Sequence, residues 1–224
     1  MKLNRYEIWL CIFGAGYIAI SPLVYFIVGD FLHAFMAWNM ILSIIPFILV
    51  KCMDNIIPKK KGLFICLFVG WILFLPNAFY MITDLIYLSQ HNFMAINEQS
   101  YASWYYLDTL IPWLALFHLV TGMIISLIFG FYAVFLMEKI GNRYLSKKLM
   151  IGLTGTLFLL SSVAIYIGRF FRYNSWDFLK VFQIIADFFE GMNLDRIFFI
   201  FGYGVMLTVF YGLFKVTHLL QKTK

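Results

Sequence analysis

The chain has 224 residues, of which 63% are hydrophobic, 21% aromatic and only 12% charged, and its mean hydropathy is +0.86. A soluble globular domain carries about 25% charged residues, so this composition excludes a soluble protein, a disordered chain and a disulfide scaffold. The formal net charge of +6 is spread over several short tracts, which argues against nucleic-acid binding. The composition predicts a polytopic membrane protein whose main partner is the lipid bilayer.

Six apolar runs are long enough to cross a bilayer, which takes about 20 residues of helix. We interpret the first as a transmembrane helix because it is too long for the apolar region of a signal peptide. The second run follows after a three-residue connection, which predicts an antiparallel hairpin. The expected fold class is all-α, a single membrane domain over residues 1–224 with about six transmembrane helices. The runs are Ile8–Val28, Leu32–Val50, Leu63–Leu88, Leu110–Met137, Leu149–Phe171 and Ile197–Leu219.

The distribution of basic residues predicts the orientation. Thirteen of the 17 lysines and arginines lie in the N-terminal flank, the second and fourth connections and the C-terminal end. These segments share one side of a chain with six spans. The positive-inside rule then places both termini in the cytoplasm, as expected for a multi-pass protein of the bacterial cytoplasmic membrane. The same charges are suited to attract anionic lipid.

Two connections on the outer side are longer than turns. The third, residues 89–103, is polar and leads into aromatic residues of the kind found at the headgroup level. The fifth has helical periodicity, with polar residues every three or four positions from Trp176 to Glu190 and bulky apolar residues opposite them. Asn174 is a suitable N-cap and Gly191 a suitable stop. We predict an amphipathic helix in the outer interface; the alternative is a weakly hydrophobic seventh span.

Polar and small residues share one face of the third, fourth and fifth spans, at about 100° per residue. A polar side chain in hydrocarbon must face protein or trapped water, and small residues let helix backbones approach. We therefore expect the three faces to converge on one outward-facing polar pocket. They carry Asn77, Tyr80 and Asp84 on the third span, Asp108, His118, Gly122 and Gly130 on the fourth, and Gly155, Tyr166 and Arg169 on the fifth.

Two prolines accompany these faces. Pro76 removes a backbone N–H inside the third span, and Asn77 lies beside the break, where its amide is placed to bind freed backbone or a ligand. Pro112 lies four residues after Asp108. This spacing predicts Asp108 as the N-cap of the fourth span, with the proline tolerated in the first turn.

Two blocks of sequence carry a resemblance to a known family. Leu75–Leu85 contains Pro-Asn-x-x-Tyr-x-x-Thr-Asp, and Gly168–Asp177 reads Gly-Arg-x-x-Arg-x-Asn-Ser-Trp-Asp. Both resemble the pattern of a family of bacterial inner-membrane proteins catalogued as domain of unknown function 1361. The resemblance covers most of the chain after about Lys61. It implies a bacterial polytopic membrane protein and supplies no mechanism.

The candidate ligand-binding residues centre on Arg169 and Arg172, which lie one turn apart. Paired guanidinium groups with a nearby amide suit a phosphate or a carboxylate, because each guanidinium can bind two oxygens. The alternative is a pair that anchors the helix end and bridges to Asp84, Asp108 or Asp177. The ligand-binding set is Asn77, Tyr80, Arg169, Arg172, Asn174 and Asp177.

The candidate catalytic residues are Asp84, Asp108 and His118. The two carboxylates are suited to a divalent cation, Ca²⁺ or Mg²⁺, which prefers oxygen ligands. The alternatives are a helix cap for Asp108 and an ion pair with one of the two arginines for Asp84.

His118 lies well inside the fourth span, where it is placed to accept a proton near neutral pH. Its alternative role is a hydrogen bond across a helix interface. The other histidines, His33, His91 and His218, receive no assignment.

Three functions remain open at this stage. The first is binding, with or without processing, of an anionic headgroup or lipid-linked phosphate, with a lid formed by the helix from about Ser175. The second is a small-solute or proton-coupled transporter, since broken helices and titratable residues mark transport paths. The third is a non-catalytic scaffold in which the polar faces only hold helices together. The sequence assigns no enzymatic reaction.

Overall fold

The protein is described here from a computed structural model that covers residues 3–56, 60–97, 103–173, 177–190 and 192–222. Six helices in these residues are long and apolar enough to cross a membrane, which confirms the predicted all-α membrane fold. Each observed helix overlaps one predicted run. They are α1 (Arg5–Val28), α2 (Leu32–Ile56), α3 (Lys61–Tyr80), α4 (Leu110–Gly141), α5 (Lys147–Tyr166) and α7 (Leu194–Lys222).

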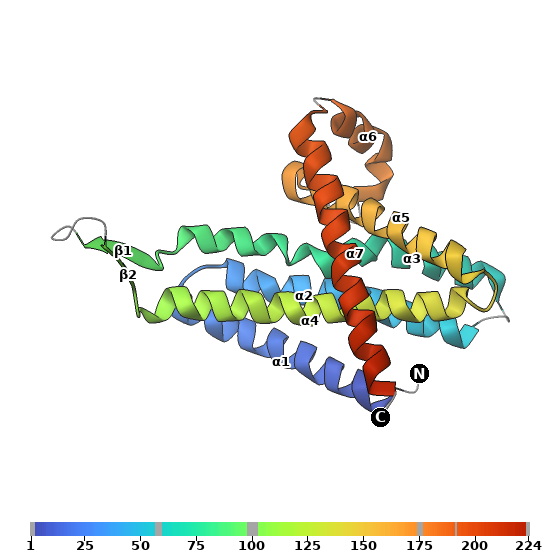
Figure 1. Ribbon diagram of the computed structural model, residues 1–224, viewed down its shortest axis with the longest axis horizontal. Coiled ribbons are helices and arrows are strands. Elements are labelled where there is room, and N and C mark those ends of the chain that lie inside the picture. Colours follow the sequence, from blue (N-terminus) through green and yellow to red (C-terminus); the bar gives the residue numbers. More distant parts are fainter. Residues whose placement is uncertain (1–2, 57–59, 98–102, 174–176, 191, 223–224) are drawn as a thin grey trace.

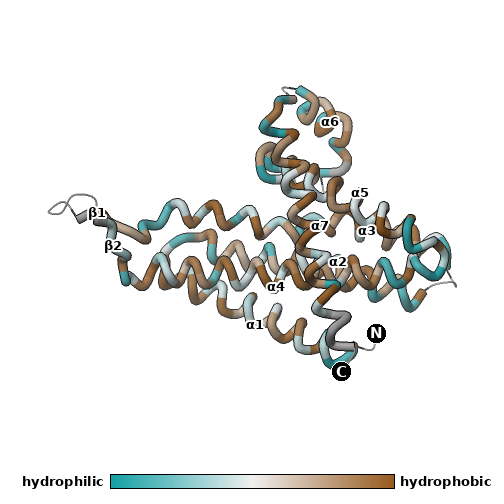
Figure 2. Tube along the Cα trace, in the orientation of Figure 1, coloured by the Kyte–Doolittle hydropathy of each residue, from teal (hydrophilic) through white to brown (hydrophobic). Residues whose placement is uncertain are grey.

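Helices α1 to α4 lie alongside one another (Figure 1). Helix α7 packs against α5 and crosses the other helices at a steep angle. Both chain ends lie on the same side, and hydrophilic residues gather at the helix ends (Figure 2). We call the side with the N-terminus of α1, the α2–α3 and α4–α5 connections and the C-terminus of α7 the basic end. The other side, with Asp84 and Arg169, is the opposite end.

The α1–α2 hairpin forms for local reasons. The side chain of Asn4 accepts a hydrogen bond from the backbone N–H of Glu7, and the Glu7 carboxylate accepts one from the N–H of Asn4. This reciprocal capping satisfies two backbone donors at the start of α1. The helix ends at Gly29, whose φ of 79° is easily adopted only by glycine. Asp30 then accepts a hydrogen bond from the N–H of Leu32 at the start of α2.

The third span differs from the single α-helix that was predicted. The α-helix stops at Tyr80, four residues after Pro76, and a 3₁₀ segment, η1 (Thr83–Gln90), continues it. A short antiparallel hairpin follows, with β1 (Met94–Asn97) paired to β2 (Ser103–Tyr106), so that Met94 faces Tyr106. The hairpin projects beyond the helices (Figure 1). It was not predicted, and part of the segment treated as a polar connection is therefore strand.

The fifth span ends in a π-helical turn, η2 (Ile167–Phe171), after which Arg172 has a φ of 61°. A 3₁₀ turn, η3 (Asp177–Lys180), and a helix, α6 (Val181–Phe189), follow. Phe182 of α6 is 86% exposed, as the predicted interfacial helix requires of its apolar face. The predicted caps Asn174 and Gly191 lie outside the described residues.

Small residues set the spacing around α4. A Cβ at Gly130 would lie 2.6 Å from the Phe79 ring of α3, and one at Gly122 would lie 2.2 Å from the Tyr17 hydroxyl of α1. These glycines therefore allow α3 and α1 to approach α4 closely, as predicted. Gly155 was predicted to share this role on α5, but a Cβ there would meet nothing within 4 Å.

Candidate functional site

The two sequence blocks that carried the resemblance meet in a buried ion pair. Nη2 of Arg169 lies 2.5 Å from Oδ1 of Asp84, and Asp84 is only 2% exposed. Nδ2 of Asn39 on α2 donates to the other carboxylate oxygen of Asp84 at 3.1 Å. The ion pair considered for Asp84 in the sequence is therefore confirmed, and it joins η1 to η2.

The remaining groups of Arg169 are also engaged. Nε and Nη2 donate to the Thr83 hydroxyl at 3.0 and 2.5 Å, and Nη1 donates to the Tyr87 hydroxyl at 3.3 Å. The guanidinium group stacks over the Tyr80 ring, 4.7 Å from its centroid. Every nitrogen of this side chain is thus bonded within the protein, and its charge is balanced by Asp84. Arg169 holds η1 and η2 together, and four of its five N–H donors are engaged by Thr83, Tyr87 and Asp84.

The other residues of the predicted site divide among several environments. Asp108 is exposed and lies one residue before Thr109, the N-cap of α4, so its predicted capping role is wrong by one position. Arg172 is exposed at the end of η2. Asn174 lies outside the described residues.

Asn77 and Asp177 have local partners. Nδ2 of Asn77 donates to the carbonyl of Phe74 at 3.1 Å, within the same helix. Asp177 forms an ion pair with Lys180 at 3.2 Å. In the structure, then, Asp84, Tyr80 and Arg169 come together in one cluster.

His118 belongs to a second buried cluster with His33, a residue that sequence analysis left unassigned. Nδ1 of His118 lies 2.9 Å from Nδ1 of His33, and its Nε2 lies 3.0 Å from Oγ of Ser21. The Tyr17 ring stacks on the His118 ring at 4.7 Å. The predicted alternative for His118, a hydrogen bond across a helix interface, is confirmed, since these partners lie on α1 and α2.

The hydrogen bonds in this cluster assign the tautomers. Ser21 donates its hydroxyl proton to the backbone carbonyl of Tyr17, so its oxygen accepts from Nε2–H of His118. Nδ1 of His118 is then an acceptor, and His33 donates to it from Nδ1. Nε2 of His33 is left as a lone-pair acceptor that is buried without a hydrogen-bond partner among the described residues. A buried acceptor of this kind is costly unless a proton or donor reaches it.

A buried arginine on α7, Arg196, borders a cavity at the opposite end. The cavity has a volume of about 430 Å³ and is lined by aromatic rings of α5, η2 and α7 together with the polar residues Asn193 and Asp195. Arg196 is 8% exposed; its Nε donates to the Tyr166 hydroxyl at 3.1 Å, and its Nη1 donates to the carbonyls of Phe188 and Glu190. No carboxylate of the described residues lies within ion-pair distance of it, and no hydrogen bond there engages its Nη2. Buried charges are normally paired, but this guanidinium has no carboxylate partner in the described residues and is faced by the rings of Tyr166, Phe171 and Phe188 at 5.2, 5.3 and 5.8 Å.

The C-terminal end of α6 lies beside this cavity, because Arg196 binds its last carbonyls. A basic side chain at a helix C-terminus satisfies carbonyls that lack helical donors. A further bond, from the Tyr173 hydroxyl to the Asp187 carboxylate at 2.7 Å, ties α6 to the end of η2. This hydrogen bond raises the pKa of Tyr173, because the phenol must keep its proton to donate it.

Two more ion pairs lie towards the basic end. Glu7, 1% exposed, pairs with Lys51 at 2.9 Å and accepts a hydrogen bond from Tyr132. Glu138 pairs with Lys215 at 2.7 Å and accepts one from Thr154. Each pair joins two helices, α1 to α2 and α4 to α7.

No group of three or more His, Cys, Asp or Glu side chains suited to a metal ion is found in the described ranges. In particular, Asp108 is exposed, whereas Asp84 is buried against Arg169. The predicted divalent-cation site between Asp84 and Asp108 stays a prediction.

Six helices long and apolar enough to span a membrane, with buried ion pairs between them, define a multi-pass α-helical membrane protein. The chain belongs to the family described as protein of unknown function DUF1361, whose profile matches residues 38–210. The matched range contains both sequence blocks and the ion pair between them. Comparisons with curated proteins and with solved structures gave no match.

Sequence reasoning missed His33, Asn39 and Arg196 as members of these clusters. His33 is the second residue of α2, and Arg196 the third residue of α7, so both look like ordinary polar helix ends. The available signal was that each lies within a turn of an apolar run, where a polar side chain that faces inward needs a partner. The partners of His33 and Asn39 lie 85 and 45 residues away, and those of Arg196 lie 6 to 30 residues away; all of them follow only from how the chain packs.

Proposed function

We propose that this protein binds an anionic phosphate-bearing headgroup, of a lipid or a lipid-linked molecule, in the cavity beside Arg196. The observation that carries the proposal is a guanidinium group that is 8% exposed, lacks a carboxylate partner in the described residues and borders a cavity of about 430 Å³. A phosphate that enters this cavity would supply the missing negative charge and accept from Nη2.

The surroundings favour an amphipathic ligand. Aromatic side chains of α5, η2 and α7, Tyr166, Phe170 and Phe199 among them, line the cavity next to Arg196. Tyr166 combines an apolar ring with a polar hydroxyl, as is typical of the bilayer interface, and Phe170 and Phe199 supply apolar surface. Helix α6, the predicted lid, is held at this cavity by the bonds from Arg196 to its last carbonyls.

The residues assigned to the anion from sequence take different parts in this proposal. Arg196 replaces Arg169, which is occupied by Asp84 and acts by positioning η2. Arg172 is exposed at the end of η2 and does not line the cavity. With the basic end in the cytoplasm, as the positive-inside rule favours, the cavity would face the outer leaflet.

The test is lipid retention measured by native mass spectrometry on protein in nanodiscs that contain phosphatidylglycerol and phosphatidylcholine. We expect Arg196→Gln to weaken retention of phosphatidylglycerol at least about ten-fold, because hydrogen bonds to a charged group contribute about 1.5–3 kcal/mol. Tyr166→Phe is the matched control, since it removes a partner of Nε and keeps the charge. Equal retention by wild type and Arg196→Gln would refute the proposal.

An added arm separates a lipid headgroup from a free anion. Inorganic phosphate that displaces the bound lipid from wild type, and not from Arg196→Gln, indicates that the phosphate group alone is recognised. If phosphate does not displace the lipid, and lipid retention still depends on Arg196, the headgroup and its apolar chains bind together.

A second candidate function, proton-coupled transport, is favoured by the His33–His118 pair. Its chain of oriented hydrogen bonds ends at the bare Nε2 of His33, which is suited to take up a proton inside the bundle. Proteoliposomes carrying a pH-sensitive dye test this candidate. Wild-type protein is expected to dissipate an imposed proton gradient faster than His33→Gln, and flux equal to that of empty liposomes would argue against it.

A further inference from the structure

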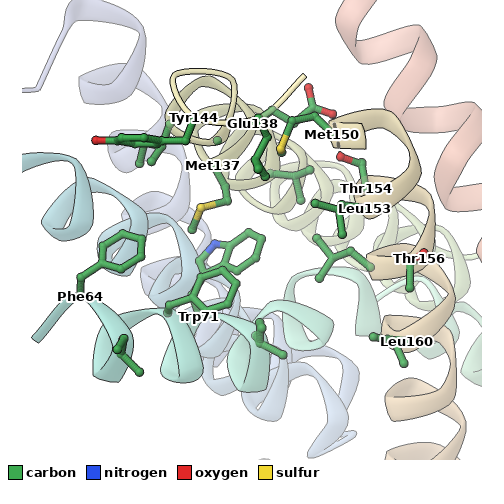
Figure 3. A pocket seen from close by; sticks show the side chains of 18 of the residues that line it. Phe64, Trp71, Met137, Glu138, Tyr144, Met150, Leu153, Thr154, Thr156 and Leu160 are labelled. Carbon is green, nitrogen blue, oxygen red and sulfur yellow. Dashed lines mark hydrogen bonds between the residues drawn. The ribbon is translucent and has the colours of Figure 1, made fainter. Parts of the chain in front are cut away.

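Helices α3, α4 and α5 enclose an apolar groove in the half of the protein towards the basic end, away from the cavity at Arg196. Its volume is about 750 Å³. Phe64 and Trp71 of α3 form one wall, Leu153, Thr156 and Leu160 of α5 the other, and Met137 of α4 lies between them (Figure 3). Ile65 and Leu160 on its rim are 59% and 58% exposed, so the groove opens sideways where the bilayer surrounds the helices.

We infer that this groove binds an acyl chain of an anionic phospholipid from the leaflet at the basic end, with the phosphate held by Lys60 and Lys61. Both lysines line the groove at the start of α3. Neither forms an ion pair within the described part of the chain. The start of α5, the facing wall, adds Lys147 and Lys148, which are exposed and also lack ion pairs there. Basic residues at the end of an apolar groove complement a lipid with a negative headgroup.

The length of the groove matches a single leaflet. It reaches along α3 from Lys61 to Ile72, a rise of about 16 Å at 1.5 Å per residue. Half of a hydrocarbon core is about 15 Å. An acyl chain whose phosphate lies at the lysines would therefore follow the groove to its end without reaching the other leaflet.

Charge and length favour a lipid chain as the occupant. The lysines at the start of α3 complement a phosphate. An acyl chain is only one methylene wide, so it can follow the irregular wall between Trp71 and Met137 from the lysines to the end of the groove.

Spin-label EPR tests the inference on intact protein in phosphatidylcholine nanodiscs that contain phosphatidylglycerol labelled midway along one acyl chain. Leu153→Trp places an indole in the groove, and we expect it to lose one motionally restricted lipid per protein relative to wild type. Leu153 is 45% exposed, so the substitution does not disturb a buried core. Ile151→Trp is the matched control, because Ile151 lies on the same helix, is 67% exposed and does not line the groove.

The charge contribution is tested separately. Lys60→Gln and Lys61→Gln are each expected to lower the preference for phosphatidylglycerol over phosphatidylcholine about five-fold, since a basic residue at a membrane surface contributes about 1 kcal/mol. Lys139→Gln, also exposed at the basic end and outside the groove, is expected to leave the preference unchanged.

Two results would overturn the inference. One is an unchanged number of restricted lipids in Leu153→Trp; the other is a dimer that Leu153→Trp dissociates, which would make a second copy the occupant. The result is independent of the cavity at Arg196: Arg196→Gln should keep the lipid in this groove, and Leu153→Trp should keep the lipid at Arg196.

Discussion

Replacing Asp84 with asparagine tests the central ion pair of the fold. The change keeps the shape of the side chain and removes its charge, so Arg169 is left as a cation whose side chain is only 15% exposed. Removing one member of a buried pair costs about 3–5 kcal/mol. Arg169 retains its bonds to Thr83 and Tyr87 and its contact with the Tyr80 ring, so we expect the lower value, about 3 kcal/mol.

The reverse change, Arg169→Gln, should cost more. Asp84 is 2% exposed, and Asn39 is then its one remaining hydrogen-bond partner in the described residues. We expect about 4–5 kcal/mol for this variant. In the double variant neither charge is left unpaired, so the sum of the two single costs should exceed the double cost by about 2 kcal/mol or more.

The measurement is the free energy of unfolding from SDS titration in mixed micelles, followed by circular dichroism. Arg143→Gln is the control, because Arg143 and Asp54 also form an ion pair, at 2.9 Å, but their side chains are 46% and 47% exposed. An exposed pair contributes about 0–1 kcal/mol. The reasoning is refuted if Asp84→Asn costs no more than Arg143→Gln, or if the two single costs simply add.

Three further predictions concern other parts of the fold. Gly122→Ala should lower the unfolding free energy by about 1–3 kcal/mol through overpacking, whereas Gly155→Ala, with open space around it, should be neutral or stabilising; the same titration compares them. Lys51→Met should lower the unfolding free energy by about 2–4 kcal/mol, because it leaves the buried Glu7 carboxylate without a partner. Glu7→Gln should lower it less, because the unpaired lysine can extend to water; equal losses would contradict this. Alkaline phosphatase fused at the C-terminus should be inactive and a fluorescent protein bright, since the basic end is expected in the cytoplasm; the reverse pattern would invert the proposed orientation.

The spans followed directly from the sequence because hydrophobic length is a local property. The first run was predicted to end at Val28, and α1 ends there because Gly29 adopts a left-handed conformation. The predicted run Leu63–Leu88 covered α3 and most of η1 but did not show the change from α to 3₁₀ geometry, which depends on the contacts of Thr83 and Asp84 with other helices. The β1–β2 hairpin was missed because its strands have four residues each and their pairing is not a periodic signal.

The side-chain clusters were harder to predict from the sequence, because most of the residues that form them lie far apart along the chain. Asp84 and Arg169 could be proposed as a pair since both were charged residues on polar helix faces. His33 could not be joined to His118, because His33 looked like a helix end and nothing in the sequence states that α2 packs against α4. For the same reason nothing in the sequence predicts partners for Glu7 and Glu138, whereas both are buried and pair with lysines.

The three buried ion pairs also determine the order in which the helices can assemble during synthesis. Glu7 and Lys51 are 44 residues apart, within the first hairpin. Asp84 and Arg169 are 85 residues apart, and Glu138 and Lys215 are 77 residues apart. At about 5–20 residues per second, the delay for Asp84 is about 4–17 s. During that time the third helix has a carboxylate and no counter-charge, so it cannot settle in hydrocarbon as the first two helices can. The buried ion pair of the first hairpin can form as soon as α2 has been made, whereas the other two form only after the fifth span and α7 have followed.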